Sequence, residues 1–131
     1  MERLLTDVTA ILVVEESDGQ PVVRWRGPIE LNFDGDLEGY HEMTDDEFSR
    51  KVIHDNQITF TEESSPYNDG YSRTFNHPGG FTIRQILDCV LEFETVARAR
   101  SHWFGCIDTH HVFFEGIRRK NNGAYEIEWG S

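Results

Sequence analysis

Cys106, Asp108 and His110 are the residues whose types and spacing most directly suggest chemistry. Side chains alternate between the two faces of an extended strand, so these three would project from one face. Zinc accepts thiolate, carboxylate and imidazole ligands, and His77 or His102 would complete a tetrahedral set. One hypothesis is therefore a small metal-dependent enzyme that uses this face. The spacing matches no paired Cys-x-x-Cys signature, and the alternative is a buried cysteine beside ordinary hydrogen-bonding residues.

A second candidate metal site lies in the glycine-bearing stretch that follows residue 33. Asp34, Asp36 and Glu38 alternate before Gly39, and Asp45 follows in a pattern that resembles the calcium-binding loop of EF-hand proteins. Calcium prefers several hard oxygen ligands, and the glycine permits the sharp turn between them. The resemblance implies a calcium ion at this loop. The alternative is an acidic turn on the surface.

Negative charge is concentrated in residues 15–63. Twelve Lys and Arg residues oppose twenty-four Asp and Glu residues in the chain, which gives a net charge of −12. Segment 15–63 holds fourteen of the acids and four of the bases, a local net charge of −10. This excess opposes binding to phosphate backbones and anionic lipid, so we expect neither a direct nucleic-acid partner nor a membrane partner. It favours encounter with a basic protein partner, although a solvated acidic face would look the same.

Three acids and three aromatics are the residues that we expect to bind such a partner. The acids follow a predicted N-cap, and the aromatics recur at four-residue intervals in a long loop predicted over residues 64–80. Aromatic residues in such a loop either anchor a partner or fold onto the core of their own domain. The candidate partner-binding residues are Asp45, Asp46, Glu47, Tyr67, Tyr71 and Phe75.

The favoured interpretation is a non-enzymatic acidic protein-binding module, such as an inhibitor, immunity protein, mimic or assembly protein. Residues 15–63 would engage a basic protein partner, with steep sensitivity of the affinity to salt. The first alternative is the metal-dependent enzyme built on Cys106, Asp108 and His110. The second is a structural subunit of a homo-oligomer, joined through the aromatic loop or a C-terminal edge strand. No cofactor is expected unless zinc or calcium occupies one of the two candidate sites.

Strands are predicted from β-branched runs and alternating hydrophobicity. Two pairs of runs flank turn-rich connections, Ser17 to Gln20 and the connection containing Asn122 and Gly123, and each pair predicts a hairpin. The predicted strands are residues 9–15, 21–26, 28–33, 57–61, 112–117 and 124–129.

Helices are predicted at two capping boxes. Thr44 and Glu47 begin a short helix that extends to about Asn56, and Thr82 and Gln85 begin a longer helix. The longer helix carries an apolar stripe that should pack on a sheet. The sequence thus predicts one globular domain over residues 1–131, of the α+β class. We expect an antiparallel or mixed sheet of about five to six strands, with two helices packed mainly on one face.

The cysteines and the apolar runs bear on the compartment. Cys89 and Cys106 could form at most one bridge, and two reduced thiols are the simpler expectation. The apolar run from Val8 to Val14 is too short for a membrane span, and acids rather than a basic region precede it. A cytoplasmic or nuclear location is therefore expected.

Overall fold

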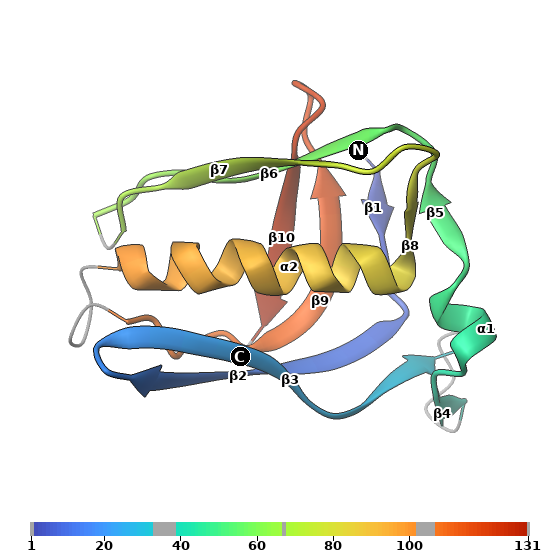
Figure 1. The fold of residues 1–131 in the computed structure, drawn as a ribbon, viewed down its shortest axis with the longest axis horizontal. Coiled ribbons are helices and arrows are strands. Elements are labelled where there is room, and N and C mark those ends of the chain that lie inside the picture. The colour runs from blue at the N-terminus through green and yellow to red at the C-terminus, as the bar shows by residue number, and fades with distance from the viewer. Residues whose placement is uncertain (1, 33–38, 67, 102–106, 131) are drawn as a thin grey trace.

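The computed structural model describes residues 2–32, 39–66, 68–101 and 107–130. The described chain is of the α+β class (Figure 1). Its helices are α1 (Asp45–Phe48), α2 (Ile83–Ala97) and the 3-10 turn η1 (Arg98–Arg100). Its strands are β1 (Arg3–Leu4), β2 (Val8–Ser17), β3 (Gln20–Asn32), β4 (Tyr40–Glu42), β5 (Lys51–Ile53), β6 (Gln57–Glu62), β7 (Tyr71–Asn76), β8 (Phe81–Thr82), β9 (Phe113–Arg119) and β10 (Tyr125–Gly130).

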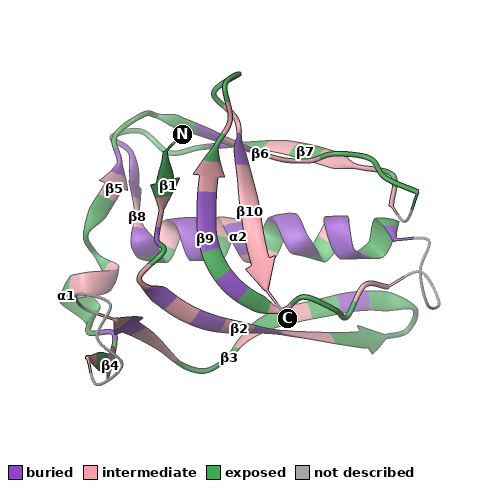
Figure 2. Ribbon diagram, turned by 180° about the vertical axis from the view of Figure 1, so that it is seen from behind, coloured by how far each residue is buried: buried purple, intermediate pink, exposed green. Residues whose placement is uncertain are grey.

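A mostly antiparallel sheet curves around α2. Its strand order is β4-β3-β2-β9-β10-β6-β7, with β1 also paired to β9. The β2–β3 and β6–β7 hairpins lie on opposite sides of α2, and β9 and β10 cross behind it (Figures 1 and 2). The only parallel pairing in the described sheet joins β10 to β6, through Tyr125 and Phe60. One long helix therefore lies inside the curve of the sheet.

Helix α2 forms where the sequence predicts it. Thr82 accepts a hydrogen bond from the backbone N–H of Gln85, and the Gln85 side chain accepts one from the backbone N–H of Thr82. This capping box satisfies two donors at the helix start. The apolar stripe packs into the core cluster, where burial of each large side chain contributes about 1.5–3 kcal/mol. The buried residues of α2 are Ile83, Ile86, Leu87, Val90, Phe93, Glu94 and Ala97.

The helix predicted at Thr44 is shorter than expected. Its capping box with Glu47 is present, but α1 ends at Phe48 instead of continuing to about Asn56. Residues Lys51–Ile53 form β5, which pairs with β8 in a separate two-stranded sheet. The β-branched pair Val52 and Ile53 suits an extended strand, and Ile53 is buried there.

The number of strands is also larger than predicted. The main sheet has eight strands in the described residues, not five or six. One of the additional strands, β7, occupies residues 71–76 of the predicted 64–80 loop and pairs with β6. Its alternating side chains include Phe75, which is buried, and Thr74, whose hydroxyl lies 2.7 Å from that of Thr59. Cross-strand pairing with β6 therefore overrode the turn-forming residues on either side of this strand.

Both predicted hairpins are confirmed. The β2–β3 turn contains Asp18 and Gly19, both with positive φ, and the β9–β10 turn contains Gly123 with a φ of 88°.

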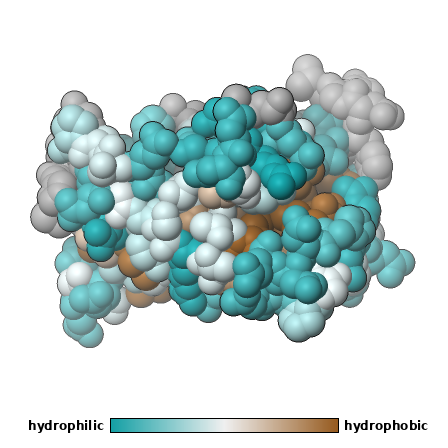
Figure 3. Space-filling model, turned by 90° about the horizontal axis from the view of Figure 1, so that it is seen from above, coloured by the Kyte–Doolittle hydropathy of each residue, from teal (hydrophilic) through white to brown (hydrophobic). Residues whose placement is uncertain are grey.

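The molecular face above β6 and β7 is largely hydrophilic, and hydrophobic residues show mainly in a recess (Figure 3). In the described part of the chain, no helix is both long enough and apolar enough to cross a membrane.

Gly116 allows β1 to lie against β9. A Cβ atom at this position would lie 2.6 Å from the Leu4 carbonyl oxygen, and the backbone φ is +112°. We expect Gly116→Ala to lower the free energy of unfolding by about 2–4 kcal/mol, measured by chemical denaturation. Gly123→Ala is the matched control, because its φ is +88° but a Cβ atom would meet nothing within 4 Å. It should cost only about 1 kcal/mol, and equal losses in the two variants would contradict the proposed contact.

Candidate functional site

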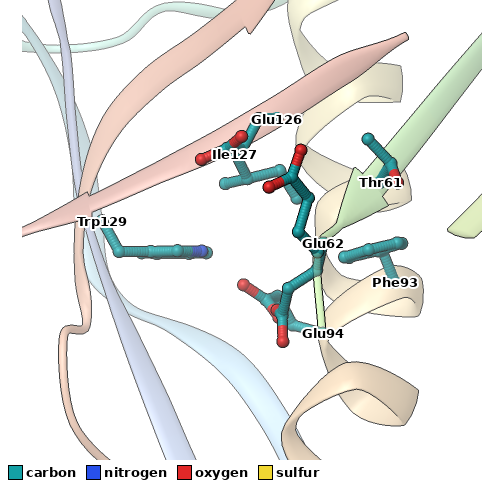
Figure 4. A pocket seen from close by; sticks show the side chains of 8 residues that line it. Thr61, Glu62, Phe93, Glu94, Glu126, Ile127 and Trp129 are labelled. Carbon is teal, nitrogen blue, oxygen red and sulfur yellow. The ribbon is translucent and has the colours of Figure 1, made fainter. Parts of the chain in front are cut away.

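A pocket of about 180 Å³ opens between the C-terminal half of α2 and the ends of β6 and β10 (Figure 4). Strands β6 and β10 pair only at Phe60 and Tyr125 and then diverge (Figure 1). Residues of both strands beyond this pair line the pocket. The pocket is lined by Thr61, Glu62, Glu63, Phe93, Glu94, Glu126, Ile127 and Trp129.

Glu94 is the deepest carboxylate of the pocket. It lies on the buried face of α2 with 2% of its surface exposed, and its Oε2 lies 3.6 Å from Nε of Arg98. The same oxygen makes no hydrogen bond with any described residue. Burial raises the pKa of Glu94 to about 7, although Arg98 opposes the shift and the carboxylate of Glu62 adds to it. Desolvation therefore outweighs the ion pair, and Glu94 gains or loses a proton near neutral pH.

Glu62 brings a second carboxylate to the pocket from the end of β6. Its side chain is half-buried, and no described cation lies within ion-pairing distance of it. Burial raises the pKa of Glu62, and the nearby carboxylates of Asp108 and Glu126 add to this effect against the opposing charge of Arg98. The ionised form of Glu62 is therefore under-compensated.

Trp129 supplies an aromatic wall and a donor that faces Glu94. Its indole ring stacks on Trp25 with centroids 5.9 Å apart, and the guanidinium carbon of Arg98 lies 5.1 Å from its centroid. Its buried Nε1 makes no hydrogen bond of good geometry with a described residue, but it lies near enough to the Glu94 carboxylate to lower the pKa of Glu94 against the effect of burial. The nitrogen end of the indole points into the pocket, toward Glu62 and Glu94 (Figure 4).

The two other carboxylates are already paired at the rim. Lys120 Nζ lies 2.6 Å from Glu63 Oε1 and 4.0 Å from Glu126 Oε2, and Arg118 Nη2 lies 3.2 Å from the same Glu126 oxygen. With Arg98 beside Glu94, three cations therefore pair with the four carboxylates that line the pocket. When all four carboxylates are ionised, the pocket is short of one positive charge, and the shortage lies at Glu62, on which Arg98 and Arg100 act only from beyond ion-pairing distance.

Arg98 connects the pocket to residues 107–112. Its buried guanidinium donates to the backbone carbonyls of Asp108, His110 and His111. His111 has a positive φ of 55°, which presents its carbonyl in this arrangement. Arg98 therefore holds this segment against the end of α2.

The backbone of residues 107–111 differs from the extended strand on which the Cys106, Asp108 and His110 metal-site prediction was based, and the metal site itself stays a prediction. Residues 107–111 are not a strand, so Asp108 and His110 do not share a face by alternation. Instead, Asp108 Oδ1 accepts a hydrogen bond of 2.8 Å from the His110 backbone N–H and lies 3.8 Å from Nη1 of Arg98. Cys106 lies outside the described residues. Among the described residues, no three His, Cys, Asp or Glu side chains gather in a way that could hold a metal ion.

The calcium-loop prediction is only partly visible. Residues 34–38 lie outside the described part of the chain. Asp45 starts α1, has a fully exposed side chain and lies 3.4 Å from Nη2 of Arg84.

The predicted partner-binding acids have different roles. Asp46 is exposed, as is Asp45. Glu47 caps α1 and lies 2.9 Å from His41 Nε2. The backbone hydrogen bond from Thr44 lowers the pKa of Glu47, and His41 adds to this effect. Glu47 therefore stabilises the local structure, and the exposed acidic surface of α1 consists of Asp46 and of Asp45, which pairs with Arg84.

The predicted aromatic anchors pack inward. Phe75 is buried against Phe60, with ring centroids 5.9 Å apart, and the half-buried Tyr71 lies 5.0 Å from Phe93. Tyr67 lies outside the described residues. The described aromatics of this segment thus support the core, and Phe93 carries their packing to the pocket wall.

Sequence reasoning missed Glu62, Glu94 and Trp129. A signal for Glu94 was present, because it lies four residues after Val90 on the apolar stripe of α2, where a charged side chain is out of place. No comparable signal marks Glu62, because an acid at the end of a strand is ordinary.

The raised pKa of Glu94 predicts a pH-dependent stability. The folded protein keeps the Glu94 proton up to a pKa of about 7, whereas the unfolded chain loses it near the ordinary value of 4.5. Stability from this residue is therefore present below about pH 4.5 and lost as the pH rises toward 7. Glu94→Gln should remove about 1–3 kcal/mol of this decline, measured by denaturation between about pH 5 and pH 8. Glu92→Gln, on the exposed face of α2, should keep the decline, and an unchanged decline in Glu94→Gln would contradict the assignment.

Removal of Arg98 should expose its structural role. Arg98→Met would leave Glu94 without its cation and three carbonyls without their donor, and we expect a loss of about 3–5 kcal/mol in unfolding free energy. Arg100→Met is the control, because the exposed Arg100 donates to a single described carbonyl, that of Gly70, at 2.7 Å, and otherwise lies 5.9 Å from the Tyr71 ring centroid. Its loss should be about 1 kcal/mol or less. Similar losses in both variants would show that Arg98 does not organise this region.

Comparison of the chain with protein-family models, with curated proteins and with solved structures finds no match.

Proposed function

We propose that the protein is a non-enzymatic acidic binding module that engages a basic protein partner. The observation that carries this proposal is the shortage of one positive charge in the Glu62–Glu94 pocket. A partner that supplies a cation there would compensate two poorly solvated carboxylates at once. Interactions of this kind contribute specificity and a high association rate.

The acidic residues of segment 15–63 lie at both ends of the molecule. Glu15 and Glu16 lie at the β2–β3 turn, at the same end as the end of β6 and the pocket, whereas α1 with Asp45 and Asp46 lies at the opposite end (Figures 1 and 2). The segment therefore does not form a single acidic face. Its overall field would attract a basic partner, and the acids near the pocket would guide the partner to it.

The size of the pocket favours binding over catalysis on a larger substrate. Pockets for complete small molecules usually span roughly 300–1,000 Å³. The present pocket has about 180 Å³, which suits a single functional group. A pair of carboxylates with raised pKa values can also perform acid–base chemistry, but that chemistry requires a substrate to be held beside them.

The proposal predicts salt-sensitive binding of a basic peptide, with the greater effect at the pocket end. Fluorescence anisotropy of a labelled lysine-rich peptide would be compared at low and high salt, with its fully acetylated form as the ligand control. We expect affinity to fall about tenfold or more with added salt. The double variant Glu15→Gln/Glu16→Gln should weaken binding more than Asp45→Asn/Asp46→Asn, which removes the same charge at the far end. Affinity that is independent of salt, or equal binding of the acetylated peptide, would overturn the proposal.

A further inference from the structure

We infer that the Glu62–Glu94 pocket binds one primary ammonium group carried on an aliphatic stem. This inference rests on the proposed function only for the source of that group, which would then be a lysine side chain of the partner. A free alkylamine would offer the pocket the same chemistry.

The unsatisfied groups of the pocket define the charge of the ligand. The Glu94 carboxylate is 2% exposed, and its Oε2 has no hydrogen bond although Arg98 lies 3.6 Å away. Glu62 faces the same space with no cation paired to it among the described residues. A buried acceptor that lacks a donor destabilises the protein, so a ligand that donates a hydrogen bond here removes that penalty. The ligand must therefore be a cationic hydrogen-bond donor.

The arrangement of the carboxylates matches an ammonium group. Glu62 comes from β6 and Glu94 from α2, so these two acceptors approach the pocket from different elements (Figure 4). An ammonium group has three donors on one compact nitrogen and can serve acceptors in different directions. A guanidinium group instead requires a flat, forked arrangement, and the guanidinium of Arg98 already lies over Trp129 at 5.1 Å.

A divalent metal ion is a poorer fit to the same acids. In the described ranges, no three acidic, His or Cys side chains are gathered closely enough to ligate one ion. Glu63 and Glu126 are also held by Lys120 and Arg118 at the rim. An ammonium group needs only hydrogen-bonding distance to each acceptor, which is a weaker demand than a shared coordination sphere.

The walls of the pocket suit an aliphatic stem. Phe93 and Ile127 provide apolar surface, and the Trp129 ring closes one side (Figure 4). A lysine-like chain buries its methylene groups against such surface while its nitrogen reaches the carboxylates. The volume of about 180 Å³ admits one such chain rather than a folded peptide.

The inference is tested by titrating the protein with n-butylammonium and following the NMR signals of the pocket residues Trp129, Glu94 and Ile127. Calorimetry measures the affinity. We expect saturable binding at one site. Glu94→Gln and Glu62→Gln should each weaken it about tenfold or more, because each removes a charge-assisted acceptor. Glu92→Gln is the matched control, since it removes the same charge from the exposed face of α2 and should change affinity less than about twofold.

Three further ligands separate ammonium recognition from general attraction of cations. n-Butyltrimethylammonium keeps the charge but lacks N–H donors, n-butylguanidinium presents a flat fork, and n-butanol lacks the charge. Each should bind at least about tenfold more weakly than n-butylammonium. Equal binding of the trimethyl compound, or equal affinity of the Glu62→Gln, Glu94→Gln and Glu92→Gln variants, would overturn the inference.

The affinity of Nα-acetyl-lysine methylamide, compared with that of n-butylammonium, identifies the source of the ammonium group. Binding at least as tight as that of n-butylammonium, with the same dependence on Glu62 and Glu94, assigns the site to a lysine side chain. Tighter binding of the free alkylamine assigns it to a small amine. If a lysine-rich peptide binds in a manner that is insensitive to both pocket variants, the pocket inference fails and partner binding stands. If n-butylammonium binds in the pocket but no basic peptide binds, the proposed function fails and the pocket inference stands.

The affinity should also depend on pH. Glu94 must be ionised to attract an ammonium group, and its proton competes with the ligand in the range where its pKa of about 7 lies. The charged groups around Glu94 are Glu62 from β6, Glu126 from β10, Asp108 from residues 107–112 and Arg98. We expect affinity for n-butylammonium to rise between about pH 6 and pH 8, and Glu94→Gln to flatten this rise. An unchanged pH profile in Glu94→Gln would show that the ligand does not meet this carboxylate.

Discussion

Glu94 and Arg98 form an ion pair where α2 passes into η1, with relative side-chain exposures of 2% and 5%. Burial of two charges costs several kcal/mol for each ion unless further hydrogen bonds offset the loss of hydration. The guanidinium of Arg98 has such partners, because it donates to three backbone carbonyls and lies over the face of Trp129. The carboxylate of Glu94 has fewer partners, since its Oε2 makes no hydrogen bond with a described residue. The pocket therefore contains a buried carboxylate oxygen that can still accept a hydrogen bond.

The curvature of the sheet places that pair at the surface of a pocket. Strands β6 and β10 are joined at one parallel position and then separate, so the sheet does not close over the end of α2. The end of β6 brings Glu62 to this gap, and β10 brings Glu126 and Trp129. A longer ladder between β6 and β10 would cover Glu94 with backbone and remove the pocket. The carboxylates are thus open to a ligand because the pairing between β6 and β10 is incomplete.

The large net negative charge has a local and a global part. The exposed acids on turns and short elements include Asp18, Asp45, Asp46 and Asp55, which water solvates well. Such charges attract cations over distances up to about the Debye length but contribute little to specificity. The pocket acids are few and partly desolvated, and each is worth more to a ligand that satisfies it. Attraction of a basic partner and recognition of one ammonium group therefore rest on different residues.

The sequence by itself determined the local structure. The two capping boxes, the two hairpins with their turns and the apolar stripe of α2 depend on residues close together in the chain, and the structure confirms each of them. The short β7 and the early end of α1 escaped prediction, because partners in β6 and β8 decided them.

Only the tertiary structure decided the site. Glu62, Glu94 and Trp129 come from three elements that meet because Phe60 pairs with Tyr125, and nothing in the local sequence specifies that pairing. Likewise, the spacing of Asp108 and His110 predicted an extended strand, but Arg98 holds their backbone carbonyls in a non-extended segment. Spacing along the chain determines periodic elements, whereas desolvation of a carboxylate depends on every element packed around it.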